Sequence, residues 1–102
     1  MQLEAIKNYL RIDHDADDEH LLFLQEVAEH YIIDAVDRRL TKDQLSECKP
    51  FTLAVLLLIS HWYKTRSATS EKPFHDIPHG VVPLVLKVRG WRDAHYQSRR
   101  DE

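Results

Sequence analysis

The stretch PFTLAVLLLISHWYKTR, residues 50–66, decides how the rest of the chain folds. Proline suits the first turn of a helix, where its missing N–H costs nothing. The run from Phe51 to Ile59 is apolar on every side, so a helix here belongs at the centre of the molecule. Lys64 and Arg66 complement the negative end of the helix dipole. The apolar run is far shorter than the roughly 20 residues that cross a bilayer, which predicts a buried core and no membrane partner.

The segments before this helix also repeat apolar residues at helical spacing. Leu3, Ile6 and Leu10 predict a short first helix. A long second helix is expected from about Asp17 to about Arg38. Its core-facing stripe comprises Leu21, Leu24, Ala28, Tyr31, Ile32 and Ala35. Because the chain has only two glycines and four prolines and no alternating apolar pattern, an all-α fold is predicted.

Three apolar residues of the second helix, Leu22, Phe23 and Ile33, fall outside that stripe. They point toward the side that also carries Glu26 and His30. Either another helix of the same chain covers them or an identical subunit does, and the sequence leaves both explanations open. The three residues are therefore candidate subunit-interface residues.

The chain after the central helix is expected to end in a last helix and a flexible arm. TRSATSEKPFHD, residues 65–76, predicts a loop, and VVPLVLKV, residues 81–88, predicts a short helix if Pro83 lies in its first turn. A strand is the alternative for the second segment. The fold class is thus a small bundle of about four helices over residues 1–90, followed by a polar C-terminal arm over residues 91–102. Candidate partner-binding residues at this arm are Arg89, Trp91, Arg92 and Tyr96.

Composition bounds the class of protein. A chain of 102 residues with 43% hydrophobic content fits one domain, which buries roughly 60 to 65% of the surface of the unfolded chain. The net charge of -3 and pI near 6.1 are unlike those of a free nucleic-acid binder. The single cysteine, Cys48, excludes an internal disulfide framework, and the first residues lack a signal-peptide layout. We therefore expect synthesis and retention in a reducing cytoplasm.

The acidic stretch RIDHDADDEH, residues 11–20, raises the question of a metal site. Its alternating aspartates are Asp13, Asp15 and Asp17. This spacing begins an EF-hand loop, but the sixth position is Asp18 instead of glycine and the twelfth is Leu24 instead of glutamate. The preferred interpretation is a helix start: Asp15 or Asp17 caps the second helix, and Asp18 and Glu19 lie in its positively charged first turn.

Other chemistry has little support in the sequence. His75 and His79 are the closest histidine pair with metal-like spacing, but they lie in a turn-rich segment without a HExxH or CxxC pattern. Glu26 and His30 predict a solvated surface pair, and His61 a histidine at the edge of the core. No nucleophile motif surrounds any serine or the cysteine, and two glycines cannot form a phosphate loop. We expect no enzyme, cofactor or metal.

Basic residues leave DNA contact open as a minor possibility. Arg38, Arg39 and Lys42 are candidates for phosphate contact, and Trp91 and Tyr96 for stacking on bases. The alternatives are a solubilising surface or a protein-binding arm. The third helix is nearly all apolar, so it cannot be a recognition helix of a helix-turn-helix domain.

Three blocks, taken together, resemble the head-tail connector proteins of tailed double-stranded-DNA bacteriophages and their prophage relatives. They are LRIDHDADDEHLLFLQEVAEHYI (10–32), LAVLLLISHWYKTRSA (53–68) and IPHGV (77–81). The likeness runs from about Leu3 to Arg89. Two departures concern the ends of helices: AVDRRL stands where many relatives have a Gly-Arg turn, and Pro83 interrupts a segment usually free of proline.

The resemblance implies a non-enzymatic virion protein at the head-tail junction. Such proteins form rings below the portal protein, extend the DNA channel, and provide a platform for tail-side neck or stopper proteins. On this basis Leu22, Phe23 and Ile33 become expected ring contacts, and the arm is expected to reach for the portal. A modestly acidic chain suits a channel wall that makes only transient, non-specific contact with DNA. The alternative is a small helical DNA-associated packaging or regulatory protein.

Overall fold

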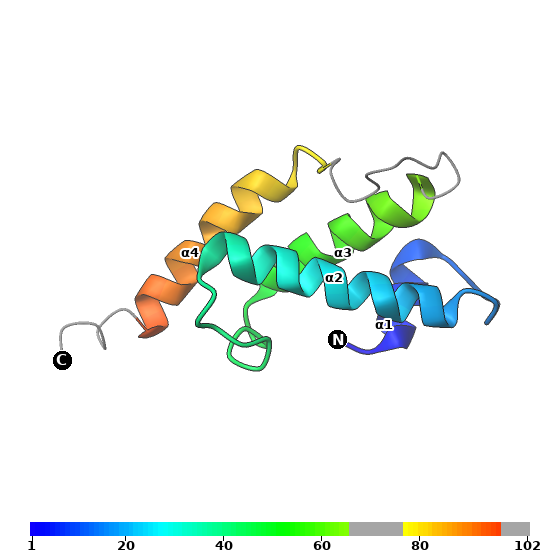
Figure 1. The fold of residues 1–102 in the computed structure, drawn as a ribbon, viewed down its shortest axis with the longest axis horizontal. Helices are drawn as coiled ribbons and strands as arrows, with labels where there is room; N and C mark the ends of the chain where they lie inside the picture. The colour runs from blue at the N-terminus through cyan, green and yellow to red at the C-terminus, as the bar shows by residue number, and fades with distance from the viewer. Residues whose placement is uncertain (66–76, 97–102) are drawn as a thin grey trace.

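The computed structural model describes residues 1–65 and 77–96, and within these ranges the chain forms four helices and no strand (Figure 1). The helices are α1 (Leu3–Leu10), α2 (Asp18–Val36), α3 (Lys49–Thr65) and α4 (Val81–Tyr96). The predicted all-α class, the short first helix and the long second helix are confirmed. The helical spacing of the apolar residues was a sufficient signal, because each helix buries one face against a neighbour.

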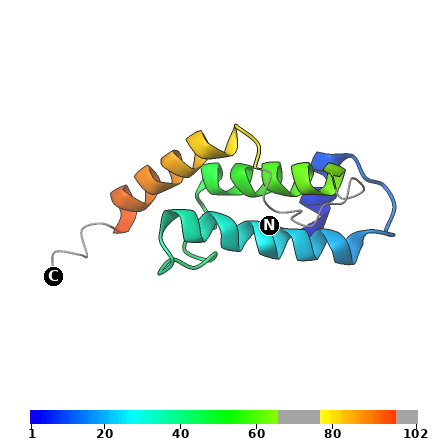
Figure 2. The same ribbon diagram turned by 45° about the horizontal axis from the view of Figure 1, so that its top comes forward.

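Two helices form the centre of the bundle. Both α2 and α3 pack against all of the other helices, whereas α1 and α4 pack on this central pair without touching each other. Figure 2 shows α2 and α3 side by side, with α1 at one end of the pair and α4 at the other. The expected central position of the third helix is therefore confirmed, and α2 shares it.

The hydrophobic core lies where these helices pack together. Its residues from α3 are Phe51, Ala54, Val55, Leu58, Ile59 and Trp62. The side of α3 that carries Leu53 is not covered, and this leucine is 43% exposed. The apolar run of α3 is thus buried on most of its circumference but not on all of it. Three neighbouring helices are too few to surround a fourth completely.

The stripe predicted for α2 is correct at four positions, the buried Leu21, Leu24, Ala28 and Ile32. At the other two positions, Tyr31 is exposed and Ala35 is half-buried. The ring of Tyr31 meets the edge of Trp62, with 6.4 Å between ring centroids, so it packs at the border of the core. Glu29 is buried instead, and its carboxylate accepts a 3.2 Å hydrogen bond from Gln25. Pairing of this kind reduces the cost of burying a polar group.

The ends of the first two helices have identifiable causes. α1 ends where Arg11 adopts the left-handed conformation, with φ 61° and ψ 43°. α2 ends at Val36 because Asp37 is extended, with φ -170°. This turn contains Asp37 and no glycine, and the helix ends two residues before the predicted Arg38. The connection to α3 buries Leu40, Leu45 and Cys48.

α4 is longer than the sequence indicated. Pro83 lies in its first turn, as the helix interpretation required, and the helix continues through Gly90 to Tyr96. The expected boundary between residues 90 and 91 is therefore not the end of an element, and residues 91–96 are helical instead of belonging to a flexible arm. Residues 97–102 of the predicted arm, and 66–76 of the predicted loop, lie outside the described residues.

Candidate functional site

The first candidate surface is the outer side of α2. Leu22 is 47% exposed and Phe23 is 52% exposed, so the four described helices cover only about half of each side chain. Ile33 is half-buried and packs against the core cluster. Of the two explanations that the sequence left open, the first therefore applies in part to Ile33, while Leu22 and Phe23 each keep about half of their surface exposed in the described structure.

Carboxylates surround these two apolar side chains. Glu19 lies one turn before Leu22, Glu26 lies one turn after it, and both glutamates are exposed. Within the described part of the chain, neither glutamate forms an ion pair. We call Glu19, Leu22, Phe23 and Glu26 together the α2 face. It combines exposed apolar area with uncompensated negative charge.

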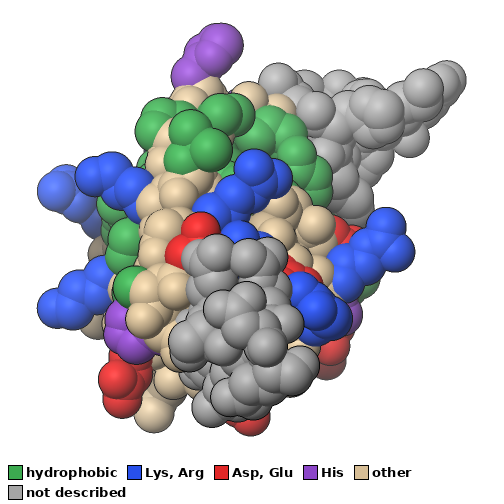
Figure 3. All heavy atoms as spheres, turned by 90° about the vertical axis from the view of Figure 1, so that its left-hand side faces the viewer, with side chains coloured by type: hydrophobic (Ala, Val, Ile, Leu, Met, Phe, Trp, Pro, Cys, Tyr) green, Lys and Arg blue, Asp and Glu red, His purple; other side chains and the backbone are tan. Residues whose placement is uncertain are grey.

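A second apolar surface, on α4, was missed by the sequence analysis. Val82 is 61% exposed and Leu86 is 58% exposed, and their spacing of four residues places them on one side of the helix. Lys87, next to Leu86, is also exposed and forms no ion pair among the described residues. We call Val82 and Leu86 the α4 face; Lys87 lies further around the helix, because consecutive residues of a helix do not face the same side. Figure 3 shows hydrophobic side chains gathered at the top of the molecule, the level at which α4 begins in Figure 1.

This second surface had a signal in the sequence. Val81 and Val88 are buried, so the segment VVPLVLKV has apolar residues on two sides of one helix. Only one of these sides can face the core. The same excess of apolar positions drew attention to Leu22 and Phe23 in α2, but the last segment was too short for its periodicity to be clear.

Arginines of α4 hold it against the end of α2. Arg89 donates a 2.7 Å hydrogen bond from its guanidinium to the carbonyl of Ala35, and Arg92 donates one of 3.3 Å to the carbonyl of Val36. The last carbonyls of a helix have no partner within the helix, so these arginines satisfy groups that need external donors. Both residues are predicted partner-binding residues of the arm; in the structure they contact α2, and their contact with a partner stays a prediction.

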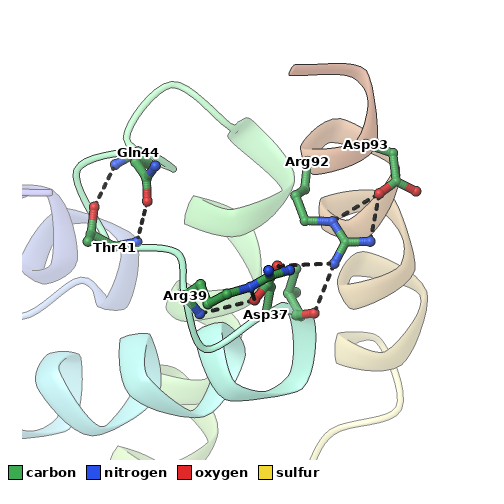
Figure 4. A network of polar contacts seen from close by, with 7 residues as sticks. Asp37, Arg39, Thr41, Gln44, Arg92 and Asp93 are labelled. Carbon is green, nitrogen blue, oxygen red and sulfur yellow. Dashed lines mark hydrogen bonds and ion pairs between the residues drawn. The ribbon is translucent and has the colours of Figure 1, made fainter. Parts of the chain in front are cut away.

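Asp37 completes this arrangement (Figure 4). Its carboxylate accepts hydrogen bonds of 3.0 and 3.1 Å from the side chain of Arg39 and one of 3.0 Å from the Arg39 backbone N–H. Arg92 lies 3.6 Å from it and also pairs with Asp93 at 2.6 Å. The hydrogen bonds from Arg39, aided by the positive charge of Arg92, lower the pKa of Asp37 to about 2. Arg39, a candidate for phosphate contact, is therefore already paired.

The other two candidate residues of the predicted arm, Trp91 and Tyr96, lie in the last turns of α4. Trp91 is half-buried and stacks on His95, with ring centroids 4.2 Å apart. This pair is spaced by four residues, which brings the rings together on one side of α4. Tyr96 is the last residue of the helix, and its side chain lies outside the described part of the structure.

The acidic stretch before α2 is tied to two other helices. Lys7 of α1 forms ion pairs with Asp15 at 2.7 Å and Asp18 at 2.9 Å, which raises the pKa of Lys7 and lowers that of Asp15. The carboxylate of Asp17 accepts a 2.6 Å hydrogen bond from the hydroxyl of Tyr63. Asp17 occupies the N-cap position, but its side chain makes no capping hydrogen bond to the helix backbone. The interpretation as a helix start is confirmed, with that correction to the predicted cap.

The described residues contain neither a metal-ligand cluster nor a helix that could span a membrane. In residues 1–65 and 77–96, no three histidine, cysteine or acidic side chains are grouped so that they could hold a metal ion. His79 is exposed, and its predicted companion His75 lies outside the described residues. His61 is half-buried at the edge of the core, as expected. None of the helices in these ranges is both long enough and apolar enough to cross a membrane.

The exposed surfaces alone do not show which family the protein belongs to, but comparison with known proteins does. A family model described as phage gp6-like head-tail connector protein matches residues 1–89. The chain belongs to this family. No curated protein and no solved structure matches it. The connector is thus a non-enzymatic structural protein of the phage virion, and its partners are components of the phage head and tail. The family match covers both the α2 face and the α4 face.

Proposed function

We propose that the connector assembles with identical copies into a ring at the head-tail junction, docked below the portal protein. The ring would extend the DNA channel and offer its other side to a neck or stopper protein. The observation that carries this proposal is the exposure of Leu22 and Phe23 on α2 in a chain of the connector family. Exposed apolar side chains next to each other favour burial against a partner, at roughly 25 cal/mol per Å² of apolar surface.

The portal contact is proposed for the C-terminal half of α4 and the residues after it. Arg89 and Arg92 bind the end of α2 and thereby fix the direction in which α4 leaves the bundle. We assign them the role of positioning residues. Trp91 presents a half-buried aromatic ring at the same end, and large aromatic side chains are frequent anchors of protein interfaces.

DNA is proposed as a transient partner only. The net charge of -3 provides no overall attraction to phosphate, and Arg39 and Arg92 are paired with carboxylates. A channel wall of this kind would let DNA pass without holding it. The alternative, a DNA-associated packaging or regulatory protein, would instead require measurable binding that weakens with salt.

The test is a variant of the α2 face. Leu22→Ser combined with Phe23→Ser is expected to keep the helical circular dichroism of the wild type but to lose oligomers, measured by native mass spectrometry with and without the portal protein. Leu53→Ser is the matched control, because Leu53 is similarly exposed but belongs to α3. The control should assemble like the wild type.

Two results would contradict the proposal. Unfolding of the double variant would mean that Leu22 and Phe23 belong to the core of a single chain. A wild-type protein that never forms an oligomer, even with the portal protein present, but binds DNA in a salt-sensitive manner would favour the alternative function.

A further inference from the structure

A single buried carboxylate stands out in the interior of the connector. Of the charged residues that the structure describes, only Glu29 of α2 is buried, with 7% of its surface exposed. Its carboxylate accepts a 3.2 Å hydrogen bond from the side chain of Gln25, one turn earlier. In residues 1–65 and 77–96, no cation forms an ion pair with it. Since buried carboxylates are normally paired with a positive charge, Glu29 lacks the partner that its position calls for.

Glu29 lines a cavity of about 130 Å³. The cavity lies where the middle of α2, the connection between α2 and α3, and the first turn of α3 come together. The connection contributes Asp43 and Ser46 to its lining, and α3 contributes Phe51 and Thr52. Its volume corresponds to that of roughly four water molecules. It is therefore a site for a small group and not for an extended ligand.

The lining favours a cation that also has an apolar part. The carboxylates of Glu29 and Asp43 are hydrogen-bond acceptors, and the hydroxyls of Ser46 and Thr52 can accept as well. The ring of Phe51 adds apolar surface. Arginine and lysine combine a cationic donor group with an apolar stem. A metal ion fits less well, because no three histidine, cysteine or acidic side chains of the described residues are grouped to hold one.

The cations of the same chain that lie near the cavity do not pair with Glu29. Lys42 contributes to the lining, but it is exposed and no ion pair joins it to Glu29 in the described structure. The carbonyl of Met1 accepts a 3.0 Å hydrogen bond from Gln25, yet no ion pair joins the amino group of Met1 to Glu29 in these residues either. The buried carboxylate is thus available to a cation from outside.

We propose that this cavity binds the cationic head group of an arginine or lysine side chain of a partner protein. Glu29 would be the main acceptor, and the exposed Asp43 would add a second negative charge. The inference goes beyond the proposed ring and does not depend on it, because it assigns a ligand to a site that ring assembly does not use. Oligomeric state is not a readout of its test, so failure of the ring proposal would leave it unchanged.

Titration of the full chain with a blocked amino acid, followed by nuclear magnetic resonance, tests the site. The probe is N-acetyl-arginine amide, and N-acetyl-citrulline amide is the matched neutral probe, because it keeps the shape of the side chain without its charge. Sodium chloride is adjusted so that ionic strength stays constant. The backbone amide signals of Gln25, Glu29, Ser46 and Thr52 should shift saturably with the arginine probe and not with the citrulline probe.

Charge-removing variants should weaken this binding in a defined order. Glu29→Gln keeps the size of the side chain and should raise the dissociation constant roughly tenfold or more, because the hydrogen bonds to a charged acceptor are lost. Asp34→Asn is the matched control, since Asp34 is exposed on the same helix and does not line the cavity. Asp43→Asn should raise the constant roughly two- to fivefold, whereas Glu47→Gln in the same connection should leave it unchanged. Asp43 and Glu47 are exposed, so this second pair keeps the test decisive even if Glu29→Gln does not fold.

Three results would overturn the inference. The first is the absence of a saturable shift with the arginine probe, or equal binding by a folded Glu29→Gln chain. The second is binding that appears only in Lys42→Gln, because the lysine of the same chain would then be the occupant. The third is tighter binding of 1,4-diaminobutane than of the blocked arginine and of N-acetyl-lysine amide, which would assign the site to a free amine instead of a side chain.

Discussion

The hydroxyl of Tyr63, near the end of α3, donates a 2.6 Å hydrogen bond to the carboxylate of Asp17, 46 positions earlier at the start of α2. This contact joins the two central helices at one end of their seam. It also explains why Asp17 does not cap the backbone of α2 with its side chain, since its carboxylate is directed toward another helix.

Replacing this tyrosine tests the contribution of the contact. Tyr63→Phe removes only the hydroxyl, and we expect the free energy of unfolding to fall by about 1 to 2 kcal/mol, because the acceptor is a carboxylate and the site is half-buried. Urea denaturation followed by circular dichroism measures it. Tyr9→Phe is the matched control, since Tyr9 is exposed and should change stability very little. Equal effects of the two variants would show that the hydrogen bond adds nothing.

Asp37 predicts a dependence of stability on pH. Its pKa is about 2 in the folded chain, below the ordinary value of 3.8 that it regains on unfolding. A lowered pKa stabilises the fold above the unfolded value, and this contribution decreases as the pH falls from about 4 to about 2. Wild type should therefore be more stable than Asp37→Asn at pH 7, and the difference should shrink over that range.

Comparison of the two proteins at each pH removes the effect of other carboxylates, which titrate in both. The measurement is the midpoint of urea denaturation from pH 7 to pH 2. A difference that stays constant with pH would show that the charge of Asp37 does not contribute through Arg39 and Arg92.

The position of α3 predicts unequal effects of two similar substitutions. Leu58 is fully buried between helices, so Leu58→Ala should lower the free energy of unfolding by about 2 to 5 kcal/mol. Leu53→Ala, on the uncovered side of the same helix, should cost less than about 1 kcal/mol. Thermal or urea denaturation distinguishes them. Similar losses at both positions would mean that the exposed side of α3 is covered even in a single copy.

The attachment of α4 predicts a local effect without global unfolding. In a chain with Arg89→Ala and Arg92→Ala, the carbonyls of Ala35 and Val36 lose their donors. Amide hydrogen exchange should become roughly tenfold faster in the second half of α4, which corresponds to about 1.4 kcal/mol of lost protection. Lys87→Ala is the control, because Lys87 makes no such contact. Unchanged exchange in the double variant would contradict the positioning role.

The fold was predictable from the sequence where apolar periodicity was long. The buried positions Leu21, Leu24, Ala28 and Ile32 repeat over several turns of α2, and the apolar run of α3 could only be central. The extent of α4 was not predictable in this way, because the few apolar side chains of residues 91–96 show no helical repeat. In this stretch Arg92 bonds to the end of α2 and Trp91 packs against the core cluster, and both contacts join residues that are far apart in the sequence.

The candidate surfaces were predicted in part. Leu22 and Phe23 were identified because they fall outside a clear stripe, and the structure leaves both exposed. Ile33 shares their side of the helix but packs partly against the core, which periodicity alone cannot show. Val82 and Leu86 were missed, since a short apolar segment with proline gives no reliable direction to its faces. The role of Leu22 and Phe23 in assembly stays a prediction.

The lack of contact between α1 and α4 has a mechanical consequence. Because α1 and α4 each pack separately on α2 and α3, a shift of one of them can change its own contacts with this central pair without moving the other. A molecule built in this way can adjust independently to unlike neighbours at its two extremities. That tolerance would be useful to a part that must fit between two larger assemblies whose shapes do not match.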